Sequence, residues 1–351
     1  MSIKYNGGYI PAVGADGTTL VANSSASTGV SWQGNQAGGK NYLINGAMEF
    51  FQRGSISAAG YALDRWKTTS YGTSWNSISF TQGTTTPPEG FRYYMRVAAG
   101  SSTNTNFGFG QALETTDVVK FANKTVTLSF YYIVNTNFSS AWTVTPVYSI
   151  GTDADISNVP NGTAIGSNQT ITNTTSWNRF TYSFTVPSTA TSFAVQFFNS
   201  NNTVSTASLD ITGVQLEIGS VATPFSRAGG TLQGELAACQ RYYWRLNGSD
   251  VSGSTIANIC NGYVESSTVI TGIYNFPIQM RIPPSIAGGA STNFIALGGG
   301  SFHYPATLST QAISKINARI SLTQTSLTAY QAGALLMSYN ATDYLEHSAE
   351  L

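Results

Sequence analysis

The chain has 351 residues, and its sixteen basic and sixteen acidic side chains give a formal net charge of zero at pH 7. That balance excludes the basic surface by which proteins bind nucleic acid. Charged residues make up only 9% of the sequence and hydrophobic residues 41%, so the chain can bury cores but must cover its surface with Ser, Thr, Asn, Gln and Gly.

The 18 Phe, 19 Tyr and 35 Gly favour strands and turns, so we expect an all-β protein, long enough for two domains. Residues 1–40 are rich in Gly, Ser, Thr and Ala, with only scattered apolar residues such as Trp32. Such a segment buries little by itself. We therefore expect an extended N-terminal arm that a partner orders.

Residues 41–228 show the alternation of antiparallel strands that have one apolar face and one face of Thr and Ser. The clearest runs are Val126–Tyr132, Phe180–Val186 and Phe193–Phe197. Runs of this kind, separated by loops that contain Gly, Asn and Pro, predict a β-sandwich or jelly roll.

The last strand of this domain changes parity in its middle. Leu209 and Ile211 share one face, whereas Val214 and the apolar residues after it follow the opposite parity. One extra residue reverses which side chains point inward, so we expect a β-bulge at Thr212-Gly213.

A change of period after this strand predicts a short helix within residues 229–246, with Thr231 as its N-cap. Four apolar residues at successive spacings of four, three and four form a stripe on one face of this helix. They are Leu232, Leu236, Cys239 and Tyr243. The stripe must pack on a domain of its own chain or on other copies, and we expect other copies. Cys239 and Cys260 make no disulfide framework and are expected to be buried small apolar residues.

Residues 247–351 return to alternating runs, the longest over residues 268–282, and show no repeat of fixed period. We therefore expect a distal β domain here, also sandwich-like or jelly-roll-like, joined to the first by the short helix.

Several segments together resemble bacteriophage tail-fibre proteins: Asn41–Gly54, Tyr61–Trp66, Asn123–Phe130, Ile211–Phe225, Cys239–Tyr243 and the terminal Ala349–Leu351. The resemblance implies a carbohydrate-binding-module-like sandwich and a fibrous homotrimer held by the helix. It further implies that residues 1–40 dock on other virion proteins and that the distal domain meets a host cell-surface glycan or protein. The expected location is the virion, after synthesis in the host cytoplasm.

The sequence predicts no enzyme, because its acidic residues are scattered and its two histidines lie in no catalytic motif. No cofactor is expected. One metal hypothesis comes from the resemblance, since carbohydrate-binding jelly rolls often hold a structural Ca²⁺ between the opening and closing strands. Glu49 and Asp210 occupy analogous places here, and carboxylates suit this hard cation.

Sugar binding requires exposed aromatic faces, so the candidates are aromatic residues in polar loops. We predict Trp75 first, with Tyr71, Tyr93 and Tyr94. The other tryptophans beside strands are expected in the core, namely Trp66, Trp142 and Trp177.

Three other kinds of protein could have the same general amino-acid composition. A head-attached fibre or capsid decoration protein would differ only in its docking partner. A glycan-degrading tailspike would need paired acids. A secreted adhesin would need an export signal, which Met1–Tyr5 does not resemble, and no run of 18 apolar residues predicts membrane insertion.

Overall fold

The computed structural model describes residues 4–5, 8–9, 18–22, 29–34, 40–54, 60–70, 78–100, 104–136, 138–158, 161–172, 174, 176–204, 206–248, 256–288, 294–338 and 343–351. It confirms the all-β class, with many strands and two short helices among these residues. The chain divides into two compact units, Met1–Glu235 with Leu351, and Leu236–Glu350. The boundary falls inside the second helix.

The described part of residues 1–40 holds two short antiparallel pairs. β1 (Lys4–Tyr5) pairs with β2 (Gly8–Tyr9), and β3 (Thr18–Ala22) pairs with β4 (Val30–Gly34).

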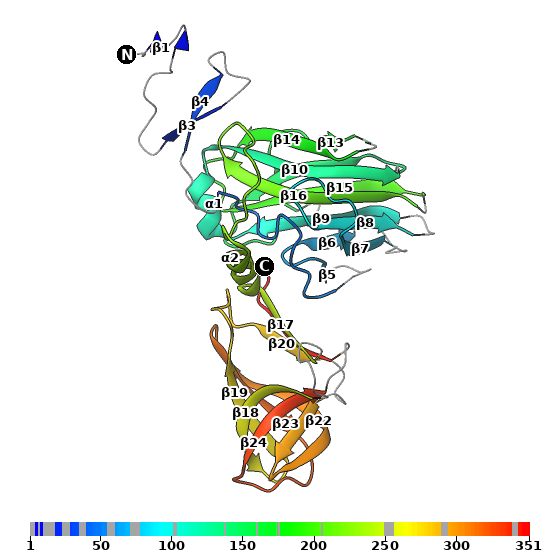
Figure 1. Ribbon diagram of the computed structural model, residues 1–351, viewed down its shortest axis with the longest axis vertical. Helices are drawn as coiled ribbons and strands as arrows, with labels where there is room; N and C mark the ends of the chain where they lie inside the picture. Colours follow the sequence, from blue (N-terminus) through cyan, green and yellow to red (C-terminus); the bar gives the residue numbers. More distant parts are fainter. Residues whose placement is uncertain are drawn as a thin grey trace. The chain divides into compact units, whose positions relative to one another are not determined.

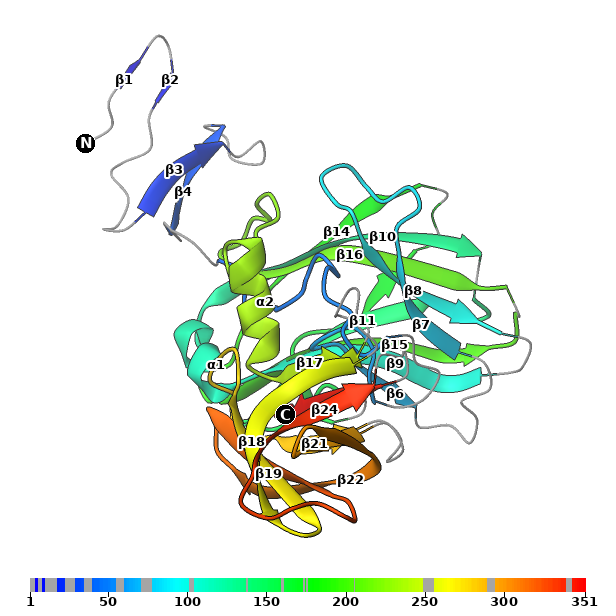
Figure 2. The ribbon, with the colours of Figure 1, turned by 60° about the horizontal axis from the view of Figure 1, so that its bottom comes forward.

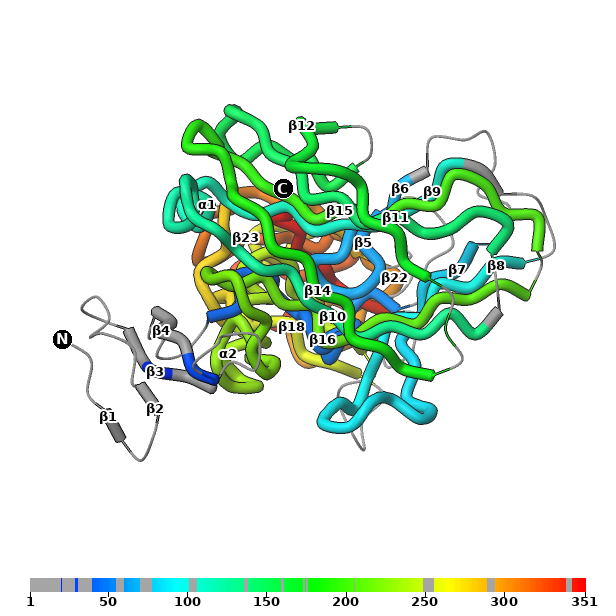
Figure 3. Tube along the Cα trace, turned by 90° about the horizontal axis from the view of Figure 1, so that it is seen from above, coloured from blue at the N-terminus to red at the C-terminus, as the bar shows by residue number. Residues whose placement is uncertain are grey.

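The first unit contains a β-sandwich of two antiparallel sheets (Figure 1). The five-stranded sheet has the order β14 (Asn178–Thr185), β10 (Thr125–Thr136), β16 (Ser208–Ile218), β8 (Tyr94–Ala99), β7 (Ile78–Gly83). Figure 3 shows β14, β10 and β16 running side by side. The other sheet has the order β12 (Thr163–Ala164), β11 (Trp142–Ser149), β15 (Ser192–Asn202), β9 (Asn104–Leu113), β6 (Lys67–Ser70), β5 (Gly60–Tyr61), with β13 (Gln169–Ile171) paired to β11. Helix α1 (Thr115–Phe121) follows β9.

The core between the two sheets is aromatic, as the alternation predicts. Phe130 of β10 contacts Phe197 of β15 across the sandwich, with ring centroids 5.2 Å apart, and Phe197 stacks on Phe109 at 4.6 Å. Trp66 and Trp142 are fully buried, which confirms their predicted core positions. Burial of each such ring stabilises the sandwich by ~2–3 kcal/mol.

The predicted bulge is present in β16. Ser129 pairs with Gln215 and Tyr131 with Thr212, so two residues of β16 oppose one residue of β10. Gly213 takes a φ of +64° at this point, a left-handed conformation that glycine adopts without steric cost.

Helix α2 (Leu232–Gln240) is shorter than the sequence predicts, and this corrects the proposed stripe. Thr231 is the N-cap, since its Oγ1 accepts a hydrogen bond from the Gly234 amide at 3.0 Å. The chain leaves the helix before Tyr243, which begins strand β17 (Tyr243–Asn247), because the aromatic run there pairs with β25 (Tyr344–Ser348) instead of extending the helix.

The second unit differs from the expected sandwich in that its strands close into a barrel. The order around the barrel is β18 (Ile256–Ser266), β19 (Val269–Asn275), β23 (Asn317–Thr323), β22 (Ser301–Ile313), β21 (Phe294–Gly298), β24 (Ala332–Ser338) (Figure 2). A three-stranded sheet in the order β17, β25, β20 (Ser285–Gly288) completes the unit. Closure satisfies the strand edges that an open sheet would expose.

Candidate functional site

The outer face of the five-stranded sheet, turned away from the sandwich core, is polar yet largely covered. Side chains of β16 on this face are buried because neighbouring segments fold over them. The Thr212 hydroxyl donates to the carbonyl of Tyr93 at 2.7 Å, and the Ser226 amide donates to Gln215 Oε1 at 2.7 Å. The loop between β7 and β8 and the segment after β16 therefore cover this face and leave two pockets open.

The first opening, which we call the Trp177 pocket, has a volume of about 170 Å³. Trp177 is half-buried, and its Nε1 donates to the Thr86 carbonyl at 2.8 Å. Its ring meets the buried Tyr94 ring edge to face, with centroids 5.6 Å apart. The pocket is lined by Thr85, Thr86, Tyr94, Arg96, Ile133, Asn135, Trp177 and Asp210.

An arginine–carboxylate pair lies beside the indole ring. Arg96 donates from Nε to Asp210 Oδ1 and from Nη2 to Oδ2, each at 2.7 Å, and Asn135 Nδ2 donates to Oδ2 at 2.8 Å. The hydrogen bond to Asp210 raises the pKa of Arg96. The Asp210 side chain is 3% exposed and that of Arg96 41% exposed, so the acid anchors the guanidinium while part of it faces solvent.

This arrangement suits a ligand that carries hydroxyl groups next to an apolar face. A hydroxyl both donates and accepts, and the pocket offers guanidinium donors, carboxylate acceptors and an amide within one cluster. The half-buried Trp177 ring supplies apolar area, and the buried Tyr94 ring supports it from behind. A few fixed polar groups among aromatic walls are typical of small-molecule sites.

The second opening, which we call the Phe225 pocket, has a volume of about 320 Å³. Three half-buried rings meet there, since Phe91 lies 5.4 Å from Tyr131 and 5.2 Å from Phe225 between centroids. Its lining residues are Ala47, Glu49, Glu89, Gly90, Phe91, Tyr131, Pro224, Phe225 and Arg227.

The four predicted sugar-binding residues have different outcomes. Tyr71 and Trp75 lie outside the described residues. Tyr94 lines the Trp177 pocket but is only 2% exposed, so it forms a wall and offers no open face. Tyr93 is half-buried against the sandwich core and lies beside the Arg92 guanidinium.

The two residues of the calcium hypothesis bind different partners. Glu49 accepts from Arg227 Nε at 2.7 Å, whereas Asp210 accepts from Arg96. Each carboxylate is thus already paired with a cation. Within the described part of the chain, no group of three or more His, Cys, Asp or Glu side chains is placed to hold a metal ion.

The predicted trimer stripe is also changed by the fold. Leu232 is 51% exposed and Leu236 is half-buried, but Cys239 and Tyr243 have essentially no exposed surface. Both cysteines are buried and neither forms a disulfide, as expected, and burial raises the pKa of Cys260 to about 11.

Sequence reasoning missed Arg96 and Asn135 and placed Trp177 in the core. One signal was available, because Trp177 follows the polar segment Asn173–Ser176, the same kind of context that singled out Trp75. The Arg96–Asp210 pair left no such signal, because its two members are 114 residues apart.

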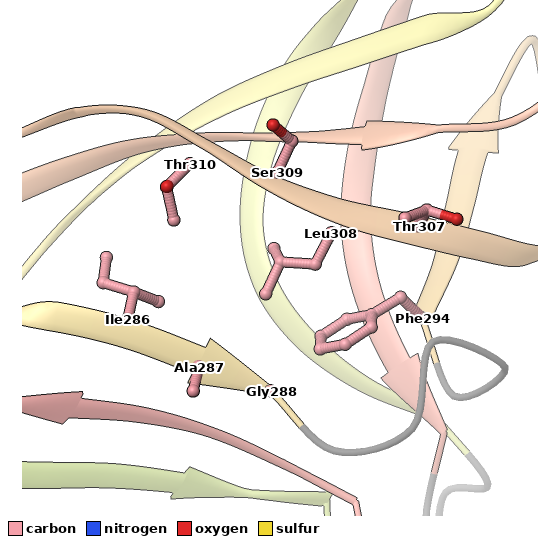
Figure 4. Close-up of a pocket in the computed structure, with 8 residues that line it drawn as sticks. All are labelled: Ile286, Ala287, Gly288, Phe294, Thr307, Leu308, Ser309 and Thr310. Carbon is pink, nitrogen blue, oxygen red and sulfur yellow. The ribbon is translucent and has the colours of Figure 1, made fainter.

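The second unit has a larger pocket, of about 430 Å³, whose eight lining residues are all uncharged. Figure 4 shows Ile286 of β20 and Leu308 of β22 pointing into it, with Phe294 at one end. Its polar lining residues are Thr307, Ser309 and Thr310. It lacks the paired donors and acceptors of the Trp177 pocket, so the first unit carries the stronger candidate site. No helix in the described regions is long and apolar enough to cross a membrane.

No family model matches the sequence, and no curated protein matches it. Among solved structures, the chain is similar to the enzymatically active domain of tailspike protein 4 of bacteriophage CBA120, at 14% identity and a TM-score of 0.35. That match covers 51% of this chain and 22% of the tailspike chain.

Carbohydrate-binding modules are also similar. A CBM4 module matches at 18% identity and a TM-score of 0.34, over 50% of this chain and 98% of the module. The CBM22-1 xylan-binding domain of Paenibacillus barcinonensis matches at 14% identity and a TM-score of 0.32, over 53% of this chain and 98% of that domain. These neighbours are distant in sequence.

Proposed function

We propose that this chain is a non-enzymatic structural protein of a phage virion, a tail fibre that binds host-surface glycans through the Trp177 pocket. The observation that carries the glycan proposal is the Arg96–Asp210–Asn135 cluster beside the Trp177 ring. The tail-fibre part rests on the sequence resemblance, which includes the Ile211–Phe225 strand and the Cys239–Tyr243 segment.

The proposed assembly is a homotrimer in which residues 1–40 dock on other virion proteins. Exposed apolar side chains support association through the second unit, because seven of the ten large ones in the described residues belong to it. They are Tyr263, Ile273, Ile282, Phe302, Tyr304, Ile316 and Tyr330. Burying them between copies would be favourable. Three linked glycan sites would also raise avidity without any new contact.

The test is glycan binding by the full-length chain, measured on an oligosaccharide array and then by calorimetry. Trp177→Ala should lower the affinity at least tenfold, because the ring supplies apolar contact that alanine cannot. Ile150→Ala is the control, since Ile150 is 76% exposed in the first unit and lines neither pocket, so its truncation should leave the affinity unchanged.

Three readouts separate the parts of the proposal. Release of oligosaccharide from a bound polysaccharide would contradict the non-enzymatic role. A single chain per particle in light scattering would contradict the trimer, while unchanged binding by Trp177→Ala would contradict the site.

A further inference from the structure

The Phe225 pocket repeats the chemistry of the Trp177 pocket. Arg227 binds Glu49 through Nε at 2.7 Å and through Nη2 at 2.5 Å, the same two-point geometry as Arg96 on Asp210. The hydrogen bond to Glu49 raises the pKa of Arg227. Aromatic rings stand beside the pair in both pockets. Each pocket therefore offers hydroxyl-binding groups next to apolar area.

The two pockets lie on one face of one sheet. Tyr131 lines the Phe225 pocket and Ile133 lines the Trp177 pocket, and these are alternate residues of β10. Alternate residues of a strand point to the same face and are about 7 Å apart. The loop between β7 and β8 also lines both, through Thr86 on one side and Phe91 on the other. A chain-like ligand on this face can reach both pockets.

The charges of the lining residues indicate the kind of ligand. In the Trp177 pocket the charges of Arg96 and Asp210 sum to zero. In the Phe225 pocket the charges of Arg227, Glu49 and Glu89 sum to one net negative charge. Arg179 lies near Tyr131, but it lines neither pocket and donates to the carbonyl of Thr223. Both lining arginines are neutralised by a carboxylate, so an acidic sugar would bring an anion to a site with no spare cation among its lining residues.

We infer that the two pockets are subsites for one uncharged oligosaccharide, which spans the outer face of the sheet from Trp177 to Phe225. This inference rests on the proposed glycan binding and adds two features to it, a ligand of several sugar units and the absence of acidic groups from that ligand.

The experiment titrates the full-length chain with neutral gluco-, galacto-, manno- and xylo-oligosaccharides of one to six units. Oligogalacturonates and sialic acid oligomers serve as the acidic set. Affinity should rise at least tenfold from one unit to the length that fills both pockets and then level off, and acidic oligomers should bind at least tenfold more weakly than neutral ones. The length series needs no variant, so it stands even if a substitution disturbs folding.

Two variants assign the subsites. Phe225→Ala should lower the affinity for long oligosaccharides at least tenfold and leave the affinity for single sugars unchanged. Trp177→Ala should lower both. Melting temperatures report whether each variant is folded, and Ile150→Ala is again the control.

The outcomes separate the inference from the proposed function. Neutral binding that is lost in Trp177→Ala but shows no length dependence and no effect of Phe225→Ala would overturn the second subsite and keep the proposed function. Tighter binding of the acidic set would overturn the charge argument. Absence of binding to every oligosaccharide would overturn the proposed glycan binding itself, and the inference with it.

Discussion

The stability of the second unit should depend on the protonation of His347. This ring is fully buried, stacks on Trp244 with centroids 4.6 Å apart and lies 5.2 Å from Phe276. Its Nδ1 donates to the Trp244 carbonyl at 3.2 Å, and its Nε2 accepts from the Tyr274 hydroxyl. Burial lowers the pKa of His347 to about 4. A neutral imidazole satisfies both partners, whereas a protonated one would be a buried cation.

The direction and size of this pH effect on stability follow from the pKa values of His347 in the folded protein and in the unfolded chain. In the unfolded chain histidine titrates near 6.5, so between pH 6.5 and 4 the unfolded state binds a proton that the folded state excludes. The contribution to stability is therefore complete above pH 6.5 and is lost as the pH falls toward 4. A difference of about 2.5 pKa units corresponds to about 3 kcal/mol at full effect.

The assay is chemical denaturation of the full chain between pH 4 and 8, with proton NMR of the imidazole rings. The chain has only two histidines, so His303→Gln and His347→Gln assign both resonances. His303→Gln should keep the pH dependence, and His347→Gln should flatten it. A His347 resonance that titrates near pH 6.5 would refute the reasoning, as would equal pH dependence in the two variants.

Three further outcomes follow from the first unit, each measured as a change in melting temperature or denaturation midpoint. Gly213→Ala should destabilise by about 2 kcal/mol, because its new Cβ would lie 2.6 Å from the Phe91 ring in a left-handed backbone; an unchanged midpoint would contradict the bulge geometry. Glu235→Ala should cost about 2 kcal/mol, because the backbone amides of Asn45 and Gly229 would lose their buried acceptor, whereas Glu235→Gln should cost less, since its carbonyl oxygen still accepts from one of the two amides. Arg96→Met should lower the stability by about 2 kcal/mol, because it leaves the Asp210 carboxylate without its cation. Arg96→Lys keeps a positive charge beside Asp210 and should therefore lose less stability than Arg96→Met.

Local pattern predicted much of the sandwich. The run Val126–Tyr132 alternates in the sequence, and β10 buries the alternate apolar residues of that run. The parity change at Gly213 predicted the bulge, and Thr231 was correctly expected as an N-cap. These features depend on residues that are close in the chain, so their periodicity is visible without a fold.

The end of helix α2 could not be predicted from the local sequence pattern alone. The spacing from Leu232 to Tyr243 fits one helix face, but Tyr243 pairs with Ser348 in a sheet. A strand partner more than a hundred residues away supplied the backbone hydrogen bonds that compete with further helix, and no window of local sequence contains that partner.

The sequence by itself determined the all-β class, the neutral hydroxyl- and amide-rich surface and the faces of the long strands, because composition and period are properties of the chain. Only the tertiary structure decided that Asp210 and Glu49 each meet an arginine and that Trp177 stands beside one of these pairs. Those contacts join segments far apart in the sequence, and they exist because the loop after β7 and the segment after β16 fold over the outer face of one sheet.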